Sequence, residues 1–148
     1  MDRKRFKKQV AFILEADKEK NILRQTHLSG HGRRENDAEH AWHMAVMTVL
    51  LSEYANEKID VLKTVTMLLI HDIVEIDAGD TYAYDEEGKK TQREREVKAA
   101  DRIFGILPDD QRDNFRNLWE EFEKGETPEA KFAHTMDNFQ PAMLNDLT

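Results

Sequence analysis

VLKTVTMLLIHDIVE, residues 61–75, is the most informative stretch of the chain. Apolar side chains occupy most positions from Val61 to Val74, so a helix that begins near Asp60 has almost no polar face. A helix that is apolar on all sides is usually buried by other helices. His71 and Asp72 stand near the end of this run, where burying an ionised carboxylate without a partner costs several kcal/mol. The stretch therefore predicts a central buried helix, ending at about residue 78, whose polar pair needs a chemical reason.

Further helices are expected around this one from the spacing of apolar residues. The first of them has Phe6, Val10, Ile13 and Leu14 on one face. The others are expected at residues 37–56, 91–107, 108–124 and 127 onward. Thr127 and Pro128 start the last helix, which Pro141 bends or ends. The polar segment 21–37 predicts a loop, after which Asn36 or Asp37 caps the next helix. Six glycines and three prolines leave few turns. We predict an all-α, single-domain helical bundle of about six helices over residues 1–148.

Composition limits the possible functions. A formal net charge of −8 argues against binding a nucleic-acid polymer, but a small anionic substrate remains possible. The chain has no cysteine, which excludes disulfides, thiolate zinc sites and cysteine nucleophiles. No apolar run reaches the ~18 residues of a membrane span, and residues 10–14 are too short for a signal-peptide core. We expect a cytoplasmic protein that does not bind membranes.

Helix geometry gives the polar pair a possible partner. If the segments before and after Glu57 run antiparallel, His40 and His71 lie at heights that differ by about 4.5 Å at 1.5 Å per residue. Two imidazoles and a carboxylate in an apolar setting suit a divalent metal, and Asp137 on the last helix is a candidate fourth ligand. Spacing alone leaves a second interpretation open, in which these histidines are hydrogen-bonded core residues.

Three motifs resemble a known family. They are R-x-E-N-x-x-E-H over residues 33–40, H-D-x-x-E-x-x-x-G-D over residues 71–80, and A-K-F-x-x-x-M-D over residues 130–137. Together they are similar to the HD superfamily of metal-dependent phosphohydrolases, in its 5′-deoxynucleotidase branch, over about residues 21–140. The resemblance implies an HD-domain helical bundle around one buried divalent metal ion, which is Mn, Fe, Co, Ni, Zn or Mg. It also implies the metal ligands, which are His40, His71, Asp72 and Asp137.

The resemblance implies further roles as well. Glu75 and Asp80 match acidic residues that are needed for turnover, and Arg24 matches an arginine that contacts the substrate. Arg33 is a second candidate, because a guanidinium forms paired bonds to phosphate oxygens. Each has a structural alternative: Glu75 as a hydrogen-bond partner of an imidazole, Asp80 as a turn residue, and the arginines as solvated loop residues.

The implied reaction is hydrolysis of a phosphomonoester, and a deoxynucleoside 5′-monophosphate is the expected substrate. Two alternatives stay open: an HD hydrolase of another phosphate ester or a pyrophosphate, and a non-catalytic, metal-stabilised domain that binds a nucleotide. The chain has 11 residues after Asp137, fewer than is usual in the family. We therefore expect a shortened C-terminus, which leaves the completeness of the substrate pocket and the formation of a homodimer open.

Overall fold

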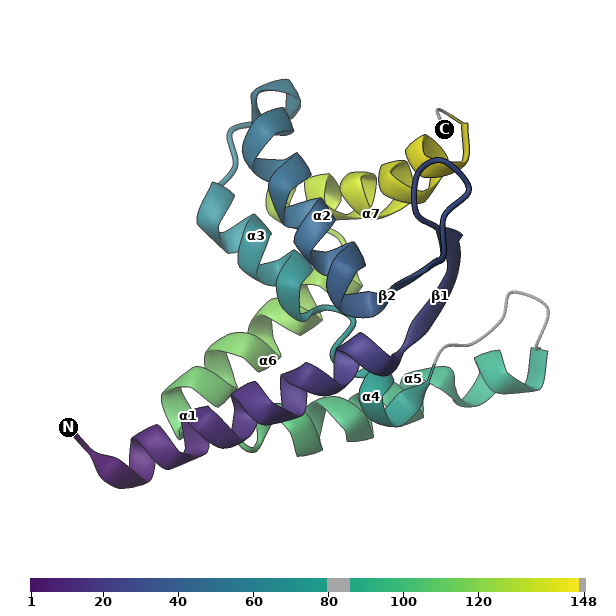
Figure 1. Ribbon diagram of the computed structural model, residues 1–148. Helices are drawn as coiled ribbons and strands as arrows, with labels where there is room; N and C mark the ends of the chain where they lie inside the picture. Colours follow the sequence, from purple (N-terminus) through teal and green to yellow (C-terminus); the bar gives the residue numbers. More distant parts are fainter. Residues whose placement is uncertain (80–85, 147–148) are drawn as a thin grey trace.

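The computed structural model describes residues 1–79 and 86–146 and is helical, as the sequence predicts (Figure 1). The helices in the described residues are α1 (Arg3–Ala16), α2 (Asp37–Leu51), α3 (Val61–Ile70), α4 (Glu75–Ala78), α5 (Glu86–Phe104), α6 (Asp109–Lys124) and α7 (Pro128–Asp146). Short 3₁₀ turns, η1 (Asp17–Asn21) and η2 (Ser52–Tyr54), follow α1 and α2. The additional element is a hairpin of two strands, β1 (Leu23–His27) and β2 (Arg34–Asn36).

Helices α2, α3 and α7 pack against one another in the upper part of Figure 1. A capping box starts α2: the Asn36 side chain accepts a hydrogen bond from the Glu39 N–H, and the Glu39 carboxylate accepts one from the Asn36 N–H. From η2 the chain returns beside α2 as α3, so the two helices are antiparallel. Met44, Met67 and Leu68 are fully buried in the core at this seam.

The predicted continuous helix from Asp60 to residue 78 is wrong, because it breaks after Ile70. Residues 71–74 form turns, and the N–H groups of Ile73 and Glu75 bond to carbonyls three residues earlier rather than four. Such bonds tighten the backbone and change its direction. As a result His71, Ile73 and Val74 are all buried. His71 and Asp72 thus project from a turn between two helices, and Glu75 begins the second of them.

Helix α1 forms where expected but presents a different face to the core. Phe12 is buried and its ring lies 6.3 Å from that of Phe104 and 5.8 Å from that of Phe115. Phe6, Ile13 and Leu14 are exposed, contrary to the predicted apolar face. The aromatic contacts of Phe12 set the rotation of the helix about its axis. Two ion pairs add to them, one from Glu15 to α5 and one from Arg5 to α6.

Segment 21–37 is also not the predicted loop. Strands β1 and β2 pair antiparallel, with Leu23 opposite Asn36, and the Asp37 N–H bonds to the Ile22 carbonyl at 2.9 Å. The Arg34 guanidinium bonds to the Arg24 carbonyl at 2.6 Å. The strands carry mostly polar side chains, so their sequence lacks the apolar alternation that marks a strand.

Helix α7 continues through Pro141 to Asp146. Of the two effects predicted for Pro141, a bend or an end of the helix, the end is therefore wrong. Proline has no N–H to bond the carbonyl four residues earlier, which here belongs to Asp137. Packing of the buried Phe132, Ala133 and Met136 against α2, α3 and α6 keeps the segment helical around this missing bond.

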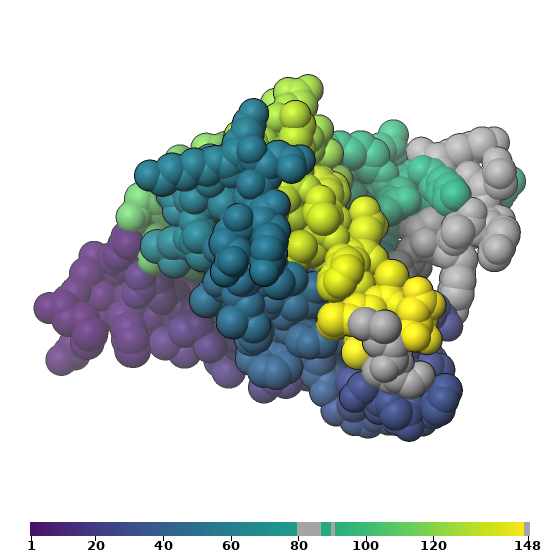
Figure 2. Space-filling view, turned by 90° about the horizontal axis from the view of Figure 1, so that it is seen from above, coloured from purple at the N-terminus to yellow at the C-terminus, as the bar shows by residue number. Residues whose placement is uncertain are grey.

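Seen from above, the C-terminal end of α2 and its following loop lie beside α7 (Figure 2). A groove of about 560 Å³ runs between them. Its lining includes Leu51, Tyr54, Ile59, Phe132, Met136 and Phe139. None of the described residues that line this groove is a predicted metal ligand, so the groove is not the predicted metal site. No helix in the described part of the chain is both long and apolar enough to cross a membrane.

Candidate metal centre

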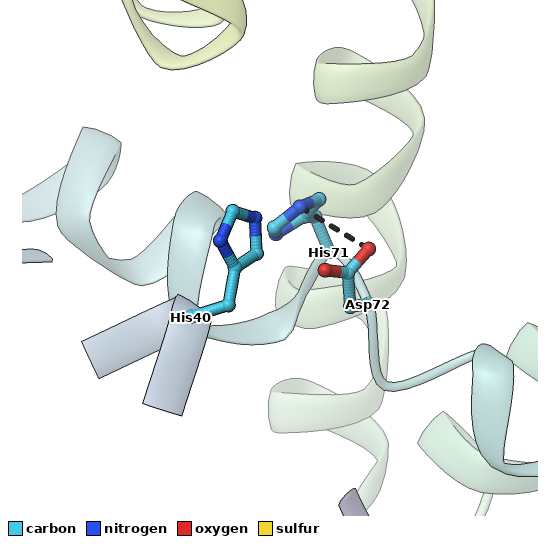
Figure 3. Close-up of side chains that lie close together, drawn as sticks. All are labelled: His40, His71 and Asp72. Carbon is cyan, nitrogen blue, oxygen red and sulfur yellow. Dashed lines mark ion pairs between the residues drawn. The ribbon is translucent and has the colours of Figure 1, made fainter. Parts of the chain in front are cut away.

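Four predicted ligands meet where three elements converge. His40 comes from the first turn of α2, His71 and Asp72 from the turn after α3, and Asp137 from α7. Nε2 of His40 lies 2.9 Å from Oδ1 of Asp137, and Nε2 of His71 lies 3.5 Å from the same oxygen. Nε2 of His71 is also 3.2 Å from Oδ1 of Asp72. Figure 3 shows the two imidazoles side by side, with Asp72 next to His71.

These distances suit donors that share one cation. With metal–donor bonds of about 2.1 Å, neighbouring donors lie roughly 3.0 to 3.4 Å apart in octahedral or tetrahedral geometry. Nε2 of His71 and Oδ2 of Asp72 are buried and make no well-directed hydrogen bond within the described residues. His40, His71 and Asp72 form a compact cluster of possible ligand atoms, and Asp137 contacts both imidazoles. The donor set therefore fits a divalent metal ion.

The second nitrogen of each imidazole is already engaged. Nδ1 of His71 lies 2.7 Å from the carbonyl oxygen of Leu68, and Nδ1 of His40 lies 2.9 Å from Oε1 of Gln140. Each Nδ1–H can donate to that oxygen, so Nε2 is the nitrogen that faces Asp137 and can bind a metal once it has lost its proton. Such partners behind a histidine fix its tautomer and orientation for metal binding.

Sequence reasoning missed two of the groups behind the ligands. Gln140 is fully buried, and its amide nitrogen donates to Oε2 of Glu35 at 2.6 Å. Glu35 is itself 2% exposed and lies 3.4 Å from Nδ1 of His40. One signal was available, because Gln140 follows Asp137 by three residues and thus shares its helix face. Glu35 is part of the motif over residues 33–40, but the sequence alone indicated no role for it.

The charges of the cluster attract positive groups. Burial disfavours the charged form of His71, but Asp72 and Asp137 outweigh this effect and raise its pKa to about 9. The pKa of His40 is raised in the same way: burial opposes its charge, and Asp137 and Glu35 favour it. Although burial opposes its ionised form, Asp137 has a pKa far below its ordinary value, because both imidazoles lie beside its carboxylate and favour its negative charge. The cluster therefore stabilises positive charge, whether protons or a metal ion supply it.

Glu75 and Arg24 lie beside this cluster. One carboxylate oxygen each of Asp37, Asp72 and Glu75 lies within 4.8 Å of the others. The Arg24 guanidinium is 3.7 Å from Asp72, 3.8 Å from Asp37 and 3.2 Å from Glu35. Burial raises the pKa of Asp37 to about 6. Asp37, Asp72 and Glu75 thus form an acidic wall beside the metal centre, and Arg24 is the cation next to this wall.

The remaining predicted residues lie elsewhere or outside the described part. The Arg33 side chain is 61% exposed and pairs with both carboxylate oxygens of Glu39, so it sits at the surface in this structure. Asp80 lies outside the described residues. Two further histidines make contacts outside the predicted ligand set: His43 contacts the Gln140 amide at 3.1 Å, and the His134 ring stacks on Phe122 at 4.1 Å.

The chain is similar to several known proteins. A family model described as HD domain matches residues 16–148. The chain is 32% identical over 105 residues to "5'-deoxynucleotidase HDDC2" of Homo sapiens, and 32% identical over 106 residues to the protein of the same name from Danio rerio. These matches include 71% and 72% of this chain but 50% and 52% of the relatives. The chain therefore spans about half the length of these curated relatives.

Solved structures share the fold. One from Magnetospirillum magnetotacticum MS-1, described as a "predicted metal-dependent phosphohydrolase", is 52% identical with a TM-score of 0.89. That match covers 95% of this chain and 70% of the other. An HD-domain phosphohydrolase from Listeria innocua is 18% identical with a TM-score of 0.67, over 88% of this chain and 64% of the other, and so supports the fold alone.

Proposed function

Because this chain belongs to the HD-domain family, we propose that it is a metal-dependent phosphohydrolase that acts on a small phosphate monoester. The observation that carries the proposal is the convergence of both Nε2 atoms on Asp137, with Asp72 beside His71. The Asp137 side chain is 29% exposed, so the buried cluster is accessible from one side. The family match from residue 16 to residue 148 supports treating the chain as one HD domain.

We propose His40, His71, Asp72 and Asp137 as the ligands of one divalent ion. Nitrogen and oxygen donors together suit Mn, Fe, Co, Ni or Zn, whereas Mg prefers oxygen alone. Such an ion polarises a phosphoryl oxygen and makes bound water more acidic. The Gln140 and Leu68 oxygens would hold the two imidazoles in the required tautomer.

Glu75 is the proposed general base of the reaction. It stands at the start of α4, and a carboxylate oxygen of Glu75 lies within 4.8 Å of one from Asp72. From this position a carboxylate accepts a proton from an attacking water while the helix break keeps it beside Asp72. Asp80 is proposed to help transfer a proton to the leaving oxygen.

Arg24 is the proposed phosphate-binding residue. Its side chain is 21% exposed and already lies among acidic groups, none of which is closer than 3.2 Å. A phosphate group that arrives at the open side of the cluster would compete for these N–H donors and receive paired hydrogen bonds. Arg33 is a weaker candidate, because Glu39 occupies both ends of its guanidinium in this structure.

A deoxynucleoside 5′-monophosphate is the proposed substrate. The names of the relatives and the motifs over residues 33–40 and 71–80 support this assignment. The test is phosphate release by metal-stripped protein that is resupplied with Mn²⁺, Co²⁺, Zn²⁺ or Mg²⁺ in turn. The substrates are the deoxynucleoside monophosphates, the corresponding ribonucleotides and pyrophosphate.

Two variants separate the components of the proposal. Asp72→Ala should lose both metal and activity, whereas Glu75→Gln should lose activity but keep the ion held by the histidines. Release from pyrophosphate alone would move the assignment to another HD hydrolase. No release from any substrate, by folded protein that binds the ion, would favour a nucleotide-binding domain and overturn the enzymatic proposal.

A further inference from the structure

Helix α1 presents an apolar stripe that the rest of the described chain leaves in water. Phe12 packs against α5 and α6, and the opposite side of the helix faces outward at one edge of the molecule (Figure 1). Phe6, Ile13 and Leu14 on that side are 51%, 65% and 67% exposed. Val10 is half-buried and continues the stripe, because residues 6, 10, 13 and 14 share one face of a helix. An exposed apolar patch with a polar border is typical of a contact surface.

A cluster of cations borders this stripe. Helix α1 carries five basic residues and one acidic residue, Glu15, in a chain whose formal net charge is −8. Arg5 points toward α6 and pairs with Asp110 at 2.6 Å, and Glu15 pairs with Arg102 on α5. The other four cations are exposed and form no ion pair within residues 1–79 and 86–146: Arg3, Lys4, Lys7 and Lys8. The apolar stripe and these four cations together form the outer face of α1.

The outer face fits an extended anionic surface better than it fits a pocket or a single carboxylate. It belongs to one helix at the edge of the molecule, and the groove between α2 and α7 includes none of its residues. No acidic residue lies between Arg3 and Leu14, and the Asp2 carboxylate caps the helix by accepting bonds from the N–H groups of Lys4 and Arg5. The free cations have long, flexible side chains, which can reach mobile anionic headgroups while the stripe meets the lipid chains.

We propose that the outer face of α1 docks the protein onto membranes that contain anionic phospholipids. The apolar stripe lies at the boundary between headgroups and acyl chains, and the four cations lie among the charged headgroups. This proposal departs from our expectation that the protein does not bind membranes, which rested on the lack of an apolar run long enough to span one. A helix that lies on a membrane needs only one apolar face. The docking is independent of the proposed hydrolysis.

Sedimentation with lipid vesicles tests the proposal on the full chain. Vesicles of phosphatidylcholine alone are compared with vesicles in which about one third of the lipid is phosphatidylserine. We expect binding to the anionic vesicles and at least about tenfold weaker binding to the neutral ones. Raising the salt concentration from about 0.1 M to about 1 M should release most of the bound protein, because the Debye length falls from about 10 Å to about 3 Å.

Two lysine pairs test the contribution of charge. Lys7→Gln together with Lys8→Gln removes half of the free cations and should lower the vesicle partition coefficient about 10- to 30-fold. The matched control is Lys58→Gln together with Lys98→Gln, which removes two exposed lysines outside α1. The control should change the coefficient by less than about threefold, because its lysines are not part of the outer face. Equal losses in the two pairs would overturn the assignment to α1.

A leucine pair tests the contribution of the apolar stripe at constant charge. Leu14→Gln should lower the partition coefficient about tenfold, whereas Leu62→Gln, at a site 76% exposed on α3, should leave it nearly unchanged. Circular dichroism checks the folding of each variant. No binding to the anionic vesicles, or equal effects of the two leucine variants, would overturn the proposal. Binding to soluble poly-glutamate but not to the vesicles would also overturn it and would assign the outer face to an acidic protein.

Discussion

Oε1 of Gln140 lies 2.9 Å from Nδ1 of His40, although 100 residues separate them in the chain. Both side chains are fully buried. Asp137, one turn earlier on α7, contacts the other ring nitrogen of His40 at 2.9 Å. Helix α7 therefore contacts both ring nitrogens of the His40 imidazole. The contact from Gln140 to Nδ1 sets the tautomer that a metal requires.

Gln140→Met tests this contact. The variant keeps a side chain of similar length but leaves Nδ1 of His40 and the Glu35 carboxylate without their amide partner. We expect metal affinity to fall about 10- to 100-fold, and the metal-free protein to lose about 1 to 3 kcal/mol of stability. Mn²⁺ titration and urea unfolding measure the two effects. Gln111→Met, which removes a half-buried hydrogen bond to Gln9 far from the metal ligands in the sequence, is the matched control. Unchanged affinity in Gln140→Met would show that Gln140 does not orient the ligand.

Metal affinity should rise with pH between about pH 6 and 8. The pKa of His71 is raised to about 9 in the metal-free protein, so its imidazole is protonated over this range. A metal must displace that proton, and each released proton makes the affinity change about tenfold per pH unit. Calorimetric titration in two buffers with different ionisation enthalpies counts the released protons. An affinity independent of pH, with no proton release, would contradict the protonated state of His71.

Glu19→Gln should stabilise the metal-free protein at alkaline pH. Burial raises the pKa of Glu19 to about 8 from an ordinary value of 4.5, and Asp72 and Asp37 add to this effect. As pH rises, the Glu19 carboxyl loses its proton near pH 4.5 in the unfolded state but only near pH 8 in the native state. The free energy of unfolding therefore falls as pH rises from about 4.5 to 8. The variant should remove roughly 1 to 4 kcal/mol of this loss at pH 8. Urea unfolding at pH 5 and pH 8 measures it, with the exposed Glu53→Gln as control. Equal pH dependence in the unaltered protein and Glu19→Gln would contradict the prediction.

The two candidate arginines should behave differently in the proposed reaction. Charge-assisted hydrogen bonds contribute about 1.5 to 3 kcal/mol, so Arg24→Gln should raise KM for a deoxynucleoside monophosphate about 10- to 100-fold. Arg33→Gln should change KM by less than about threefold, because Arg33 is exposed and paired with Glu39. Steady-state kinetics at saturating metal compares the two variants. The reverse order would assign phosphate binding to Arg33.

The relative position of the histidines could be predicted because it depends on helix geometry. Antiparallel helices joined by a short connection bring residues at similar distances from the turn to similar heights. The structure places the His40 and His71 rings 6.2 Å apart accordingly. The capping box at Asn36 and the left-handed Gly125 at the end of α6 also follow from local sequence.

Features that depend on distant partners could not be predicted. The break after Ile70 allows His71, Ile73 and Val74 all to be buried. A continuous helix would point these residues in different directions. Asp37 was recognised only as a possible helix cap, because its role in the acidic wall requires Asp72 and Glu75 to lie opposite it. The hairpin was missed because main-chain bonds such as that from Asp37 to Ile22 hold it, and the apolar pattern does not show them.

The separation of the ligands along the chain has a kinetic consequence. His40 and Asp137 are 97 positions apart, so their contact closes most of the chain into one loop. Because of this high sequence separation, we expect the contact to form only after α7 docks, late in folding. An interaction absent from the folding transition state slows unfolding and leaves the refolding rate nearly unchanged. Bound metal should therefore lower the unfolding rate of the native protein and leave its folding rate nearly unchanged.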